Sequence, residues 1–70
     1  MMVTNKFSER LKELRTDKGL SQKQLANKVN LSDVAICLWE QNKRVPNLDA
    51  VIALADFFDV SLDYIAGRED

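Results

Sequence analysis

The chain has 70 residues, 46% of them hydrophobic, and a formal net charge of −1. This length allows one domain, the composition is typical of a globular protein rather than a disordered one, and no apolar run approaches the ~18 residues of a membrane span. The first residues lack the apolar stretch of a signal peptide, and the single cysteine, Cys37, cannot form an internal disulfide, so we expect a cytoplasmic location.

The sequence offers few groups for catalysis. It contains no histidine, one cysteine and two glycines, and it has neither a cluster with metal-ligand spacing nor a glycine-rich phosphate loop. We therefore expect no enzymatic activity, no cofactor, no metal and no small-molecule ligand.

Charge is divided unevenly along the chain. Residues 1–44 carry nine Lys and Arg against five Asp and Glu, a net charge of +4, whereas residues 45–70 carry one against six, a net charge of −5. A dipolar domain of this kind can present a basic face to phosphates. An accidental asymmetry of a solvated surface produces the same numbers, so charge by itself leaves both interpretations open.

The first helix is predicted over residues 5–18, because Phe7, Leu11 and Leu14 fall on one stripe at helical spacing. Gly19 follows it and suits the left-handed position that ends many helices. Leu20 is expected to fold back onto the apolar stripe.

A second, short helix begins at a capping box, in which Ser21 is the N-cap and Gln24 reaches back to its amide. Its inward face consists of Leu25, Ala26 and Val29. Asn30 comes where the chain must turn, and asparagine tolerates positive φ better than most residues.

A third helix is predicted after the N-cap Ser32, with Asp33 in the first turn complementing the helix dipole. Ile36 and Trp39 share one face of this helix. That spacing predicts a tryptophan in the core rather than a platform for stacking bases.

Two further helices follow a loop over residues 42–46. Asn47 is the N-cap of the fourth helix, which Asp59 ends, and Ser61 caps a last short helix that Gly67 closes. The fourth helix has a wide apolar face: Leu48, Val51, Ile52, Leu54, Ala55 and Phe58. The fifth contains Leu62 and Ile65.

The connection between the second and third helices is only three residues long, which is typical of a helix-turn-helix. Ala26 supplies a small residue where the helices cross, Asn30 accepts the turn, and Ile36 is a branched apolar plug. An ordinary αα-hairpin in a small bundle fits the same pattern. The sequence thus predicts a single all-α domain over residues 1–70, a compact five-helix bundle with the motif at about 21–41.

Longer stretches carry a resemblance to a known family. Residues 7–26 read FSERLKELRTDKGLSQKQLA, residues 46–49 read PNLD, residues 60–67 read VSLDYIAG, and Trp39-Glu40 stand at the end of the third helix. These stretches resemble the Xre-type helix-turn-helix domains of phage repressors and Cro proteins, from about Phe7 to Gly67. The resemblance implies a lambda-repressor-like fold and binding of operator DNA by a transcriptional repressor or regulator.

The resemblance also implies roles for individual positions. In this family the third helix lies in the major groove of double-stranded DNA. Arg15 and Glu40 look like a structural ion pair between the first helix and the end of the third, so we exclude both from the DNA contacts. The positions that correspond to phosphate contacts are Gln22, Lys23, Gln41, Lys43 and Arg44. A solvated loop is the plain alternative for such residues.

The base-reading positions depart from the family pattern. They are Asp33, Val34 and Leu38, with Ala35 and Cys37 at the margins, where family members usually carry long hydrogen-bond donors. What remains is apolar contact with thymine methyl groups and acceptance of a hydrogen bond from a cytosine amino group by Asp33.

Two functions are therefore compared. In the first, the domain is a regulator whose specificity is thymine-rich and partly read from DNA shape. In the second, the fold serves as a protein-interaction or antitoxin-type module, and Val34 and Leu38 form its contact surface. The retention of Gln22, Lys43 and Arg44 favours DNA binding.

Family members usually bind near-palindromic sites as two-fold dimers, so we expect a homodimer. Phe57 and Tyr64 are two aromatic residues that either form a dimer contact or complete the core. The sequence leaves these two alternatives open.

Overall fold

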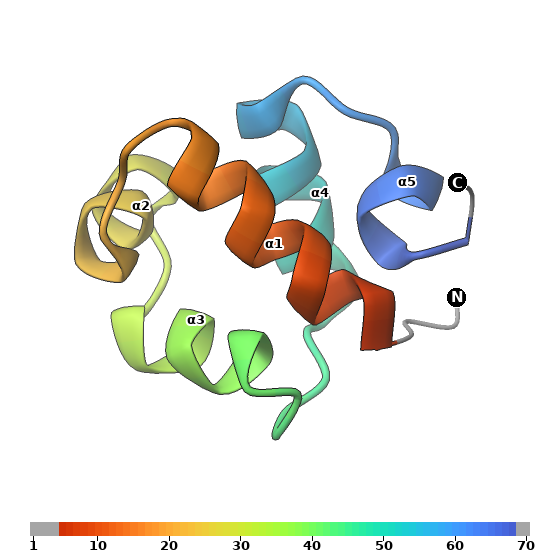
Figure 1. The fold of residues 1–70 in the computed structure, drawn as a ribbon, viewed down its shortest axis with the longest axis horizontal. Helices are drawn as coiled ribbons and strands as arrows, with labels where there is room; N and C mark the ends of the chain where they lie inside the picture. Colours follow the sequence, from red (N-terminus) through yellow and green to blue (C-terminus); the bar gives the residue numbers. More distant parts are fainter. Residues whose placement is uncertain (1–4, 69–70) are drawn as a thin grey trace.

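The computed structural model describes residues 5–68, and every element within them is an α-helix (Figure 1). In chain order the helices are α1 (Asn5–Asp17), α2 (Gln22–Val29), α3 (Asp33–Glu40), α4 (Leu48–Phe58) and α5 (Leu62–Ala66). The all-α class and the five helices predicted from the sequence are confirmed, with boundaries that differ by one residue at the end of α1.

Helices α2 to α5 begin at capping side chains. Ser21, Ser32, Asn47 and Ser61 each accept a hydrogen bond from the backbone N–H three residues further on. At α2 the bond is reciprocal, because the Ser21 N–H donates to Gln24 Oε1 at 2.8 Å. Each cap satisfies an N–H that would otherwise lack an intrahelical partner.

The five helices also share one way of ending. Each is followed by a residue with positive φ, and the N–H of the next residue donates to the carbonyl five positions earlier, as Leu31 does to Ala26 at 2.9 Å. This is the Schellman arrangement, which closes the last turn of a helix. The five positive-φ residues are Gly19, Asn30, Asn42, Asp59 and Gly67. The positive φ of Asn42 was not predicted.

One apolar core joins all five helices. Helix α1 packs against α3 and α5, α2 packs against α3 and α4, and α4 packs against α5. Leu11, Leu25, Ile36, Leu54 and Ile65 are fully buried where these helices meet. The predicted small residue and plug of the motif, positions 26 and 36, are both buried in this core.

Trp39 belongs to the same core, as predicted. Its ring meets the edge of Phe7 with centroids 6.3 Å apart, so α3 and the start of α1 are in contact through two aromatic side chains. Its Nε1 is buried and lacks a hydrogen-bond partner among the described residues. The tryptophan therefore holds α3 by packing rather than by polar contacts.

The expected wide apolar face of α4 is only partly buried. Val51, Leu54 and Phe58 are in the core, but Leu48 is 52% exposed and Ile52 is 37% exposed. These two residues, one turn apart, lie on a side of α4 that its neighbours leave uncovered. The apolar face is thus as wide as predicted, but the side that carries Leu48 and Ile52 is not part of the core.

None of the helices within residues 5–68 has the length and apolar character needed to cross a lipid bilayer.

Candidate nucleic-acid interface

Helices α2 and α3 form the motif around a sharp turn at Asn30. This residue has φ 56° and ψ 45°, and its N–H donates to the carbonyl of Ala26. Only residues 30–32 separate the two helices, so the chain reverses within one turn. Buried Ala26 and Ile36 keep the pair together from the inside. The outer side of α3 remains uncovered as a result.

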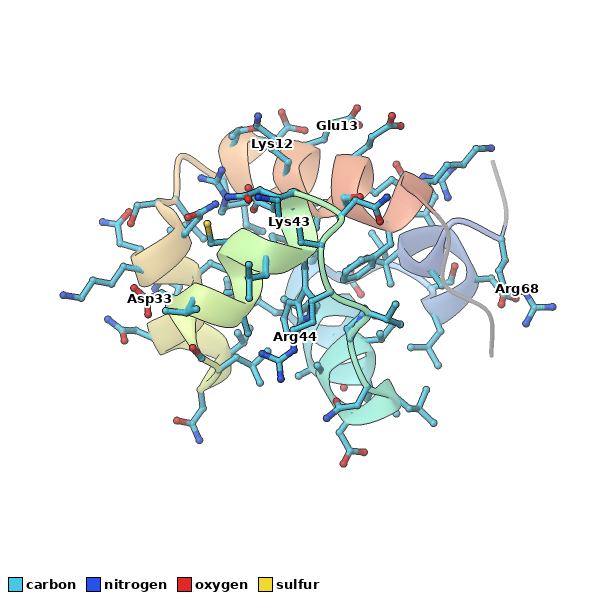
Figure 2. The ribbon with its side chains drawn as sticks, turned by 90° about the horizontal axis from the view of Figure 1, so that it is seen from below. Lys12, Glu13, Asp33, Lys43, Arg44 and Arg68 are labelled. Atoms are coloured by element: carbon cyan, nitrogen blue, oxygen red, sulfur yellow. The ribbon has the colours of Figure 1, made fainter. Side chains whose placement is uncertain are left out.

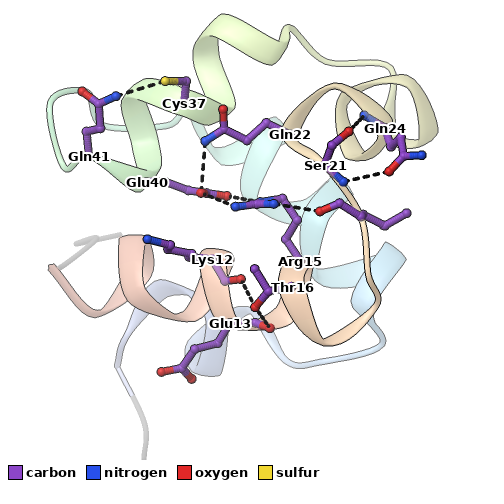
Figure 3. Close-up of polar contacts among 11 residues, drawn as sticks. Lys12, Glu13, Arg15, Thr16, Ser21, Gln22, Gln24, Cys37, Glu40 and Gln41 are labelled. Atoms are coloured by element: carbon purple, nitrogen blue, oxygen red, sulfur yellow. Dashed lines mark hydrogen bonds and ion pairs between the residues drawn. The ribbon is translucent and has the colours of Figure 1, made fainter.

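Arg15 of α1 and Glu40, the last residue of α3, are held together by two hydrogen bonds (Figure 3). Nε donates to Oε2 at 2.7 Å and Nη2 donates to Oε1 at 3.0 Å, while Nη1 donates to the carbonyl of Leu20 at 2.7 Å. The Arg15 side chain is 12% exposed and that of Glu40 is 4% exposed. Hydrogen bonding to Glu40 raises the pKa of Arg15, although burial acts in the opposite direction.

Gln22 joins this ion pair from the start of α2. Its Nε2 donates to Glu40 Oε1 at 3.2 Å, so the carboxylate connects three helices (Figure 3). An amide group has two N–H donors and a carbonyl acceptor. The bond to Glu40 therefore orients Gln22 and leaves capacity for another partner.

The outer face of α3 carries the proposed base-reading positions. Asp33 is exposed, and Figure 2 shows it at one end of α3. Val34 is 62% exposed, whereas Leu38, one turn later, is only partly buried rather than open. Ala35 packs against the core, and Cys37 has intermediate exposure. The structure thus separates the two aliphatic residues that the sequence treats alike.

The basic residues after α3 are presented by its C-terminal turn. Asn42, with φ 58°, reverses the backbone, and the Lys43 N–H donates to the carbonyl of Leu38 at 2.9 Å. The side chains of Lys43 and Arg44 are both exposed, and Figure 2 shows them on the same side of the molecule as α3. The backbone anchors the first residue of this basic pair to the helix.

Two other phosphate candidates have different surroundings. Lys23 is exposed in the first turn of α2. Gln41 is exposed at the end of α3, where its Nε2 donates to Cys37 Sγ at 3.1 Å (Figure 3). The five phosphate candidates therefore lie at the two places where the motif begins and ends, none of them fully buried.

Two features of this interface were missed from the sequence. The left-handed turn at Asn42 had a local signal similar to that of Asn30, an asparagine just beyond the end of a helix. The link between Gln22 and Glu40 had no local signal, because its partners are 18 residues apart and meet only through the packing of α2 against α3.

Both aromatic residues considered for a dimer contact are engaged within the chain. The Arg10 guanidinium lies 4.2 Å from the centroid of the Tyr64 ring, and its Nη1 also donates to the Tyr64 carbonyl. Phe57 is partly buried against the core, with the Lys18 ammonium 5.6 Å from its ring centroid. Phe57 therefore packs against the core, whereas Tyr64 is engaged by Arg10 and is not among the residues of the core cluster.

Comparison with known proteins gives a consistent picture. The sequence pattern of the helix-turn-helix family matches residues 11–65. The chain is 39% identical over 64 residues to the HTH-type transcriptional activator BcrR of Enterococcus faecalis, covering 91% of this chain and 31% of that protein. It is 34% identical over 64 residues to the HTH-type transcriptional regulator ImmR of Bacillus subtilis, with coverages of 91% and 50%.

A third relative is similar over the same length of this chain. The chain is 36% identical over 64 residues to the uncharacterized HTH-type transcriptional regulator YobD of Bacillus subtilis, covering 91% of this chain and 57% of that protein. The chain thus spans between about a third and just over half of the length of these three relatives.

Proposed function

The chain belongs to the Xre-type helix-turn-helix family, and from this membership we propose that it is a DNA-binding transcriptional regulator that places α3 in the major groove of operator DNA. This role requires no catalysis, and we propose that it is exercised in the cytoplasm. One relative is named an activator and another a regulator, so the comparisons favour regulation in general over repression in particular.

The observation that supports this proposal most directly is the placement of charge and exposure around α3. Glu40, the acidic group at the end of this helix, is nearly buried against Arg15, so it adds no open negative charge there. Lys43 and Arg44 are exposed in the turn that follows this helix. A duplex lying along α3 would therefore meet cations at the end of the helix, where backbone phosphates would pass.

Phosphate contacts fix the position of such a domain, but base contacts decide where it binds. We propose that Gln22, Lys23, Gln41, Lys43 and Arg44 contact phosphates. Base reading falls to Asp33, Val34 and Leu38, with apolar contact to thymine methyl groups and a hydrogen bond from a cytosine amino group to Asp33. No arginine or glutamine is available on the outer face of α3 for bidentate contact with a purine.

We propose further that the protein binds as a homodimer on two half-sites. One module makes few base contacts, and a two-fold dimer doubles them on a near-palindromic site. Among residues 5–68, the four most exposed large apolar residues outside α3 all lie between positions 45 and 62: Val45, Leu48, Ile52 and Leu62. A second copy that covers Leu48 and Ile52 would bury apolar surface that this chain leaves in water.

A titration of the full chain on duplex DNA tests the proposed function. Duplexes are first selected from a random pool at low salt, and affinity is then measured at three salt concentrations on the selected and on random sequences. DNA binding predicts a linear fall of log affinity with log salt, and tighter binding to the selected duplex. Absence of binding at low salt would instead promote the protein-interaction alternative.

A further inference from the structure

We propose that Val34 and Asp33 together read the 5-methyl and 4-amino groups of a pyrimidine, so that 5-methylcytosine is bound more tightly than either cytosine or thymine at one operator position. This inference rests on the proposed function, because it assumes that α3 enters the major groove. It goes beyond it in assigning sensitivity to methylation of DNA.

Val34 is the side chain that the structure offers for methyl recognition. It is 62% exposed on the first turn of α3, whereas Ile36 and Trp39 of the same helix are buried and Leu38 is partly buried. The Val34 side chain has few rotamers, so it loses little conformational freedom when its methyl groups pack against another methyl group. Within α3, Val34 is therefore the apolar residue that can give the most new contact area to a base.

Asp33 precedes Val34 and is exposed as well (Figure 2). Ser32 fixes this turn, because its hydroxyl oxygen accepts a hydrogen bond from the N–H of Ala35 at 3.3 Å. An ionised carboxylate only accepts hydrogen bonds. It therefore suits the 4-amino group of cytosine and not the 4-carbonyl group of thymine, which is also an acceptor.

The two groups that these side chains prefer stand next to each other on one base. In the major groove cytosine presents an amino donor, and thymine presents an acceptor and a 5-methyl group. A cytosine that carries a methyl group on C5 offers both the donor and the methyl. Asp33 and Val34, an acceptor and an apolar side chain at successive positions of one helical turn, match that combination. Unmodified cytosine offers a partner to Asp33 only.

The experiment uses the full chain and the selected duplex. Each thymine is replaced by uracil in turn, which removes a methyl group, and each cytosine is replaced by 5-methylcytosine in turn, which adds one; both changes keep the base pair. At the position where the methyl group changes affinity most, thymine, uracil, cytosine and 5-methylcytosine are then compared. We expect about a fourfold loss for uracil against thymine and about a fourfold gain for 5-methylcytosine against cytosine, the size of one buried methyl group.

Two variants assign the effect to residues. Val34→Ala should reduce both methyl ratios towards one while the salt dependence stays the same. Asp33→Ala should keep the methyl ratios and lower the preference for 5-methylcytosine over thymine by about tenfold or more, the value of one hydrogen bond to a charged group. Ratios between duplexes are compared, because loss of the Asp33 charge also reduces repulsion by phosphates.

The possible results of this experiment distinguish failure of this inference from failure of the proposed function. Salt-dependent binding that is indifferent to every uracil replacement and to 5-methylcytosine would overturn the inference and leave DNA binding intact. Methyl ratios that survive in Val34→Ala would overturn the assignment to Val34, and the same measurement on Leu38→Ala would show whether the other aliphatic residue carries them. Absence of binding to any duplex would overturn both proposals.

Discussion

Arg15 and Glu40 are 25 residues apart in the chain, yet their side chains form a two-pronged ion pair with N–O distances of 2.7 and 3.0 Å. The pair is nearly removed from solvent and ties α1 to the last residue of α3. Because Lys43 and Arg44 follow that residue after only Gln41 and Asn42, the pair also helps to hold in place the turn that presents them.

Removing one partner of this pair should destabilise the fold. Arg15→Ala strands the Glu40 carboxylate, and Glu40→Ala strands the Arg15 guanidinium, so we expect each to lower the free energy of unfolding by roughly 3 kcal/mol. Lys12→Ala is the matched control, since Lys12 is an exposed cation on the same helix and should cost less than about 1 kcal/mol. Urea titrations of the three variants measure the difference, and equal losses in all of them would contradict the prediction.

The left-handed backbone conformation of Asn30 predicts how substitutions at this position change stability, which its side-chain contacts alone would not predict. Asn30→Gly should leave stability unchanged or raise it slightly, because glycine adopts φ 56° without steric cost and this gain offsets the added freedom of the unfolded chain. Asn30→Ala should lower it by about 1 kcal/mol. Thermal melting distinguishes the two. A clear fall in Tm for the glycine variant would mean that the asparagine side chain stabilises the turn in its own right.

Arg44 and Arg68 form a natural pair for testing the phosphate contacts. Both are exposed, but Figure 2 shows Arg44 beside α3 and Arg68 at the far edge of the molecule. Arg44→Ala should weaken binding to all duplexes alike and reduce the slope of log affinity against log salt by about 0.9, the value of one phosphate contact. Arg68→Ala should leave the slope unchanged. Equal slopes for both variants would remove Arg44 from the interface.

Exposure also predicts how the two aliphatic residues of α3 respond to truncation. Val34→Ala should change the free energy of unfolding by no more than about 0.5 kcal/mol, since the side chain is mostly in water. Leu38→Ala should cost about 1 kcal/mol, because part of a larger side chain loses its packing. Chemical denaturation measures both values. Should Val34→Ala prove the more damaging, its side chain would be packed rather than presented.

The homodimer predicts an effect of charge on the uncovered side of α4. Leu48→Lys places an ammonium on a residue that is 52% exposed, so the monomer should fold normally while a dimer that covers this site should weaken by tenfold or more. Leu62→Lys, at a residue that is 36% exposed, provides a comparison for the start of α5. Sedimentation equilibrium over a range of protein concentrations measures the change, and identical association of wild type and Leu48→Lys would exclude this face.

The helices and their ends were predictable from the sequence because the signals are local. Ser21, Ser32, Asn47 and Ser61 cap helices by bonding an N–H only three residues away, and Gly19 and Asn30 end them through their own backbone preference. The buried faces were also predictable, because helical spacing places residues such as Ile36 on the inner side of their helix. Nothing in these effects depends on distant parts of the chain.

Exposure within an apolar stripe, by contrast, was decided by the tertiary structure. Residues 34 and 38 lie almost above each other on a helix, as do 48 and 52, so periodicity assigns each pair to one face. Which edge of that face is covered depends on where the neighbouring helices pass, and this left Val34 and Leu48 in solvent. The contact of Gln22 with Glu40 has the same origin, since two side chains 18 residues apart meet only after α2 and α3 have packed.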